Sequence, residues 1–75
     1  MIYARADIVS NVWKIVAREG DQVGAGDVLA VMESMKMEIP LVAPVGGYVS
    51  KVLVTLGQIV QEGDPIVEID ETASA

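Results

Sequence analysis

The sequence contains neither cysteine nor histidine. Without cysteine the chain can form no disulfide framework and no thiolate metal site. Without histidine it lacks the side chain that most often binds metals or acts as a general base near neutral pH. We therefore expect no metal site and no catalytic residues, which excludes a self-contained metalloenzyme and a Ser-His-Asp hydrolase.

Positive charge and long hydrophobic runs are also scarce. Five basic residues face eleven acidic ones, and the net charge is −6. We expect no binding to nucleic acid or to anionic membranes, because both require basic side chains that displace counterions. No apolar run approaches the length of a membrane span, and residues 1–7 lack the basic and apolar regions of a signal peptide. These features predict a cytoplasmic protein.

Short apolar runs rich in Val, Ile and Leu are separated at close intervals by Gly, Pro, Asn and Asp. No window has the periodicity of an amphipathic helix, so the pattern predicts a small all-β sandwich or barrel. Seventy-five residues suffice for one small domain. We expect residues 1–70 to form it and the small, polar residues 71–75 to be a disordered C-terminal tail. The expected strands include residues 12–16, 28–32, 49–54 and 65–69.

An internal repeat relates the two halves of the chain at an offset of 37 residues. The copies cover about residues 2–33 and 39–70, and neither could bury its apolar face alone. We therefore predict a pseudo-two-fold β-sandwich or flattened barrel, with the matched glycines in turns that need positive φ or close backbone approach. The matches include Gly20 with Gly57, Gly26-Asp27 with Gly63-Asp64, and Lys14 with Lys51.

The segment 33–38 between the copies is not explained by the repeat. It should form a hairpin, yet Met35-Lys36 lacks the Asn-Gly or Asp-Gly residues that two-residue turns favour. Lys36 is also the one lysine without a repeat mate. Such departures from local rules are typical of functional sites. From the residues alone, two interpretations stay open: an amine displayed for covalent attachment, or an ordinary surface lysine flanked by two core methionines.

Around this segment the sequence resembles the biotinyl/lipoyl attachment domains, and specifically their biotin-carrier branch. Met35-Lys36-Met37 matches that family's attachment signature, and the resemblance covers about residues 3–70. The chain is most similar to the free-standing, single-domain members. Further matching positions are residues 12–16, Glu19-Gly20-Asp21, Gly26-Asp27, Pro40, Ala43-Pro44, Gly46-Gly47 and Val49.

The resemblance implies a barrel-sandwich hybrid of two four-stranded sheets. It implies that biotin protein ligase attaches biotin to Lys36 and that biotin acts there as a swinging arm. A biotin carboxylase would load the biotin with a carboxyl group, and a carboxyltransferase would remove it. The chain would be a biotin carboxyl carrier protein, a subunit of a biotin-dependent carboxylase rather than an enzyme itself. We expect it to be a monomer when free.

The same resemblance suggests roles for the residues that flank Lys36. Met35 and Met37 would be read by the ligase and the carboxylase, which suits a flexible, polarisable side chain. Glu33 and Glu38 would orient or screen the lysine. One departure from some family members is the short segment 17–21, which leaves no room for the protruding thumb that certain carriers insert there.

Two other functions compete with this one. A lipoyl carrier would use the same fold and Lys36, but lipoyl domains usually have Asp before the lysine and Ala after it. An unmodified structural or adaptor β-sandwich is the other alternative, although such modules normally carry long insertions at the hairpin and an export signal. No carboxylate pair forms a recognisable catalytic site.

Overall fold

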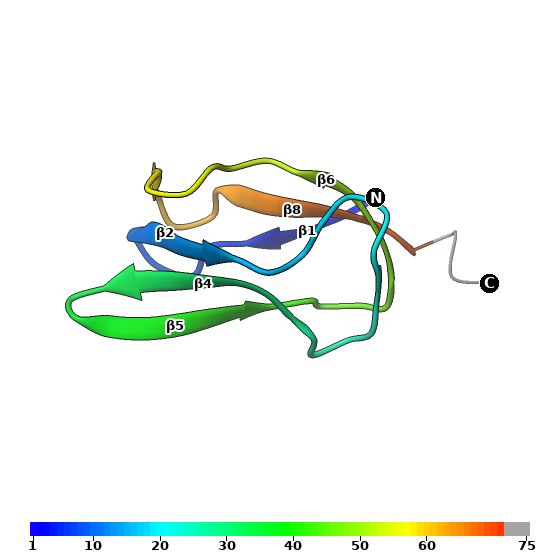
Figure 1. Ribbon diagram of the computed structural model, residues 1–75, viewed down its shortest axis with the longest axis horizontal. Coiled ribbons are helices and arrows are strands. Elements are labelled where there is room, and N and C mark those ends of the chain that lie inside the picture. The colour runs from blue at the N-terminus through cyan, green and yellow to red at the C-terminus, as the bar shows by residue number, and fades with distance from the viewer. Residues whose placement is uncertain (72–75) are drawn as a thin grey trace.

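The computed structural model describes residues 1–71, which form eight β-strands in two layers (Figure 1). Of the expected tail, only Glu71 is described; residues 72–75 lie outside the described part of the chain. None of the described residues forms a helix long and apolar enough to cross a membrane. The strands are β1 (Ile2–Arg5), β2 (Ser10–Ile15), β3 (Gln22–Val23), β4 (Val28–Ser34), β5 (Met37–Val42), β6 (Gly47–Val52), β7 (Ile59–Val60) and β8 (Pro65–Asp70).

The strands pair in two antiparallel four-stranded sheets, in the orders β1-β8-β6-β3 and β5-β4-β2-β7. Each sheet takes two strands from each half of the chain, so the two repeat copies are interlocked rather than merely stacked. This arrangement confirms the all-β class, the two four-stranded sheets and the four expected strands, whose ends shift by one or two residues. It also gives a structural reason why neither half can fold alone.

The pseudo-two-fold repeat extends to details of the backbone. Gly20, Gly57, Gly26 and Gly63 all have φ between 83° and 93°, which confirms the prediction for the matched glycines. Register shifts occur at equivalent places, between Val12 and Lys14 in β2 and between Val49 and Lys51 in β6. The shared bulges bend both sheets around the core in the same way.

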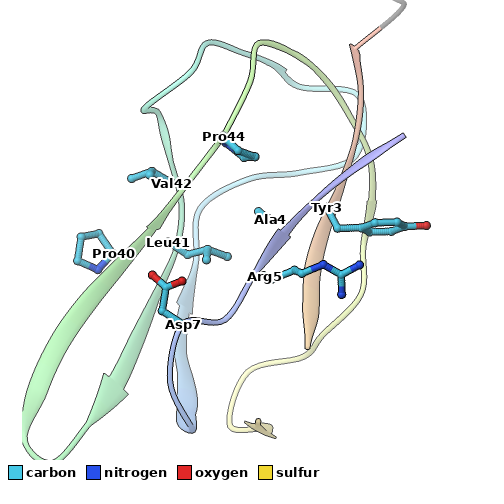
Figure 2. Close-up of a pocket in the computed structure, with 8 residues that line it drawn as sticks. All are labelled: Tyr3, Ala4, Arg5, Asp7, Pro40, Leu41, Val42 and Pro44. Carbon is cyan, nitrogen blue, oxygen red and sulfur yellow. The ribbon is translucent and has the colours of Figure 1, made fainter. Parts of the chain in front are cut away.

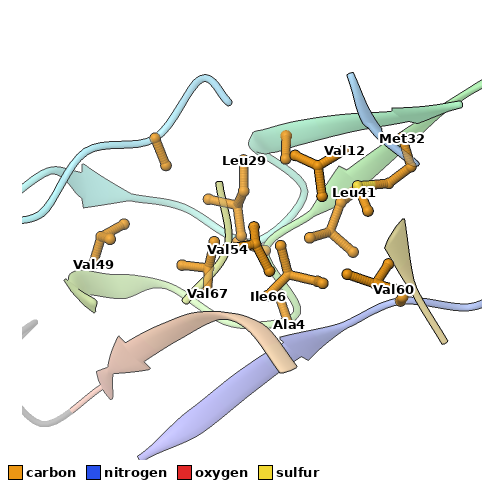
Figure 3. Close-up of a cluster of buried hydrophobic side chains, with 14 of the residues drawn as sticks. Ala4, Val12, Leu29, Met32, Leu41, Val49, Val54, Val60, Ile66 and Val67 are labelled. Atoms are coloured by element: carbon orange, nitrogen blue, oxygen red, sulfur yellow. The ribbon is translucent and has the colours of Figure 1, made fainter. Parts of the chain in front are cut away.

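The core fills the space between the two sheets (Figure 3). Its centre is symmetric, because the fully buried Leu29 and Ile66 are repeat mates on β4 and β8. Full burial of a side chain of this size stabilises a fold by about 2 kcal/mol. Burial of Leu29 thus anchors β4 to the core, and β4 leads directly into the hairpin that carries Lys36.

A polar network on the outer face of β1, β6 and β8 centres on Glu68. The hydroxyls of Ser50 and Tyr3 donate hydrogen bonds to its carboxylate at 2.8 and 3.0 Å. These bonds hold the pKa of Glu68 below its ordinary value of 4.5. The hydrogen bond between Tyr3 and Glu68, together with the negative charge of Glu68, raises the pKa of Tyr3 above 10.0.

We expect Glu68→Gln to lower the pKa of Tyr3 towards 10.0, because the neutral amide no longer opposes a phenolate. An ultraviolet absorbance titration in a Tyr48→Phe background measures Tyr3 alone; an unchanged pKa would contradict the network.

Since folding lowers the pKa of Glu68, the network stabilises the fold above about pH 4.5. That contribution is lost as the pH falls through the lowered pKa, and the Glu68→Gln variant should lack this acid dependence.

Candidate functional site: the hairpin that carries Lys36

Strands β4 and β5 form a hairpin in which Ser34 pairs with Met37, leaving Met35 and Lys36 as a two-residue turn. Their φ angles are 51° and 67°, which corresponds to a type I′ turn. Within residues 1–71 they are the two residues other than glycine with positive φ. A left-handed conformation costs such a residue about 1 kcal/mol or more. The mismatch noted in the sequence is therefore a real strain at the hairpin tip.

The methionines beside Lys36 face solvent. Met35 is 88 % exposed and Met37 64 %, so neither is a core residue. This excludes the interpretation of Lys36 as a surface lysine between two core methionines. Lys36 is exposed as well and makes no hydrogen bond or salt bridge to any residue in 1–71. The tip therefore displays a free primary amine between two exposed thioethers.

Glu33 and Glu38 lie directly opposite each other, one residue pair below the base of the turn. Both are exposed, and neither forms an ion pair with Lys36 within the described residues. Like charges at opposed positions of an antiparallel pair are unfavourable. The two carboxylates thus form a local negative site near the lysine without holding its side chain in place, and their predicted flanking role stays a prediction.

Ser34 positions the hairpin relative to the rest of the molecule, and the sequence did not predict this. Its hydroxyl donates a hydrogen bond of 3.1 Å to the backbone oxygen of Val9, in the loop between β1 and β2. Ser34 immediately precedes the turn, so this contact ties the end of β4 to the β1–β2 loop. The contact joins residues 25 positions apart in the chain, and no local pattern in the sequence could indicate it.

A shallow groove of about 300 Å³ lies between the edge strands β1 and β5 (Figure 2). Its one basic side chain is already engaged, because Arg5 donates a hydrogen bond to the Gly63 backbone oxygen at 2.9 Å and lies 5.3 Å from the Tyr3 ring centroid. The lining of the groove includes none of the predicted site residues on segment 33–38. In residues 1–71 no cluster of acidic side chains is placed to bind a metal. The hairpin is therefore the candidate site.

The position of the hairpin suits a group that other proteins must reach. It projects at one end of the molecule, and both ends of the described chain lie at the opposite end (Figure 1). The β2–β3 connection is the tight turn Arg18–Asp21, closed by an Asp21 N–H bond to the Arg18 oxygen, and no thumb projects from it. The fold and the site thus define a two-sheet β-domain that displays an exposed lysine on a strained hairpin.

The chain belongs to the biotin/lipoyl attachment family, whose description is "Biotin-requiring enzyme" and which it matches over residues 5–69. It is 57 % identical over 65 residues to the biotinylated protein TB7.3 homolog of Mycobacterium leprae, covering 87 % of this chain and 92 % of that protein. It is 42 % identical over 65 residues to the biotin/lipoyl attachment protein of Bacillus subtilis, covering 87 % and 89 %. It is thus a small protein of carrier type.

A solved structure gives the same fold. The urea carboxylase of Kluyveromyces lactis superposes with a TM-score of 0.87 at 35 % sequence identity, over 92 % of this chain. The matched part is 6 % of the carboxylase, so this chain corresponds to one small piece of that enzyme. The likeness confirms the barrel-sandwich architecture that the sequence predicted.

Proposed function

We propose that this protein is a biotin carboxyl carrier, biotinylated on Lys36. The observation that supports the proposal most is the exposed Lys36 amine, which has no hydrogen-bond or salt-bridge partner within residues 1–71 and lies between two exposed methionines on a strained turn. The names of its relatives support biotin as the group carried, since they include a biotinylated protein and a urea carboxylase.

The exposed amine fits this attachment chemically. Biotin protein ligase removes a proton from the Lys36 ammonium, and the amine then attacks the activated carboxyl carbon of biotin. An amide bond forms and the activating group leaves. The hairpin contributes access: its turn leaves Lys36 exposed at one end of the molecule (Figure 1), and Met35 and Met37 offer apolar surface for the ligase to recognise.

Once attached, biotin supplies a ring nitrogen that can carry a carboxyl group between enzymes. A biotin carboxylase and a carboxyltransferase are the partners in this proposal, and both reactions occur in their active sites. The protein holds the arm at one end of a rigid domain, which leaves the remaining surface available for docking. Amide formation also removes the positive charge of Lys36, so the net charge becomes one unit more negative. The proposal retains the cytoplasmic location expected from the sequence.

Mass spectrometry of the protein purified from its own cells tests the assignment. We expect one biotinyl group per chain, on the peptide that contains Lys36, and a positive streptavidin blot. A lipoyl group on that peptide would show that the protein is a lipoyl carrier instead, an alternative that the name of the Bacillus subtilis relative keeps open. An unmodified Lys36 in cells that biotinylate other proteins would overturn the proposal and favour an adaptor role.

A further inference from the structure

Four exposed apolar side chains lie on segments at the same end of the molecule as the hairpin (Figure 1), and neither the core nor the attachment chemistry accounts for them. Leu56 and Ile59 are 65 % and 69 % exposed, and Ile8 and Val9 are exposed as well. We call these four residues the apolar collar. Single exposed apolar side chains are normal on a protein surface, whereas several around one functional group indicate an interaction site.

Hydrogen bonds and strand pairing place the collar next to the hairpin. The Val9 backbone oxygen accepts the Ser34 hydroxyl at 3.1 Å, and Ser34 lies two residues before Lys36. In the sheet that contains the hairpin, Asn11 of β2 pairs with Ile59 of β7 on one side and with Glu33 of β4 on the other. The β1–β2 loop, the β6–β7 turn and the hairpin tip all lie at the same end of the molecule (Figure 1).

The internal repeat provides a control within the same chain. At the offset of 37 residues, the equivalents of the collar lie at the far end of the molecule, which carries no hairpin tip. There Leu56 corresponds to Glu19, Ile59 to Gln22 and Val9 to Gly46, while Ile8 corresponds to the half-buried Val45. The fold therefore accepts polar residues at the positions of Leu56 and Ile59, and of the four collar residues only Ile8 has an apolar equivalent at the far end.

Acidic residues border the collar. Asp7 precedes Ile8, Glu33 and Glu38 oppose each other across the hairpin, and Glu62 lies in the β7–β8 turn. That turn is held against the β1–β2 loop by the Gly63 N–H bond to the Ala6 oxygen at 2.8 Å. All four carboxylates are exposed. A partner that covers this end must complement an apolar centre and a negative rim.

We propose that the apolar collar is the docking surface for the biotin carboxylase that acts on the group attached to Lys36, and that the carboxylase meets it with apolar side chains bordered by basic ones. This inference rests on the proposed function. The collar orients the carrier so that the arm enters the active site, and it adds affinity that the two-residue tip cannot supply alone. The carboxylase would then contact Met35 and Met37 together with the collar.

The test uses the full, biotinylated protein and biotin carboxylase from the same cells, with ATP and bicarbonate. The variant Leu56→Gln/Ile59→Gln leaves the net charge unchanged, and its side chains match the size and polarity of the repeat equivalents, so it should fold. We expect its KM as a substrate to rise about tenfold with kcat unchanged, because docking is weakened and the chemistry is not. Carboxylation of free biotin confirms that the enzyme is active in each assay.

Trp13→Ser is the matched control. It removes a large exposed apolar side chain of β2 that is not one of the four collar residues, and its repeat equivalent is already Ser50. Its KM should remain within about twofold of the parent. An unchanged KM in the double variant, or an equal rise in Trp13→Ser, would overturn the docking surface. If the parent carries no biotin by intact mass, the proposed function itself fails, which is a separate and recognisable result.

Discussion

Lys36→Arg is expected to abolish labelling completely. A guanidinium is protonated at all accessible pH values and is not a nucleophile towards an activated carboxyl group, so no amide can form. The substitution keeps the positive charge and a long flexible side chain, and Lys36 makes no hydrogen bond or salt bridge within residues 1–71 that would be lost. Co-expression with biotin protein ligase, followed by intact mass and a streptavidin blot, should show the parent labelled and the variant entirely unlabelled.

The other two lysines provide the controls. Lys14 and Lys51 are repeat mates on β2 and β6, and both are exposed, so Lys14→Arg and Lys51→Arg should be labelled like the parent. Thermal unfolding should place all three variants within a few degrees of the parent, since surface substitutions of this kind alter stability by about 0.5 kcal/mol or less. Residual label on the Lys36→Arg variant would mean that another amine is the acceptor.

The fold was largely predictable because each half of the sequence repeats the pattern of strands and turns in the other half. Gly26 and Gly63 indicated equivalent turns, and both have the left-handed backbone that such turns need. The interlocking of the halves was not predictable from the repeat alone. Strand β3 pairs with β6, and β7 with β2, so each short strand crosses to the other half. A two-residue strand has no periodicity from which its partner could be inferred.

The site was predictable where the sequence departs from turn chemistry and not where it depends on distant contacts. Met35-Lys36 is unsuited to a two-residue turn, which marked the hairpin tip correctly. Whether the methionines were buried depended on the hairpin's projection beyond the sheets, which only the three-dimensional structure settles. The sequence offered one indication of a role for Leu56 and Ile59, because each is apolar where its repeat equivalent is polar. That difference can be interpreted only once the structure shows that both residues lie at the end of the molecule that carries the hairpin tip (Figure 1).

Met35→Asn is expected to stabilise the protein and impair its labelling at once. Asn adopts the left-handed backbone readily and is favoured at the first position of a type I′ turn, so relief of strain should add about 1 kcal/mol to the free energy of unfolding. The same change removes an 88 % exposed thioether from beside the amine. If the ligase buries Met35 as a central contact, kcat/KM for biotinylation should fall about 30-fold, equivalent to about 2 kcal/mol.

Met35→Leu separates the two effects. Leucine keeps the apolar surface but gains nothing in a left-handed turn, so its labelling should stay within about threefold of the parent with no increase in stability. Urea unfolding and single-turnover labelling measure both quantities on the same samples. An Asn variant labelled as fast as the parent would show that the ligase does not read Met35. If stability and labelling change in opposite directions, this explains why a small domain retains a strained residue at the tip of its hairpin. Asn would make the turn more stable, but the ligase recognises the methionine side chain.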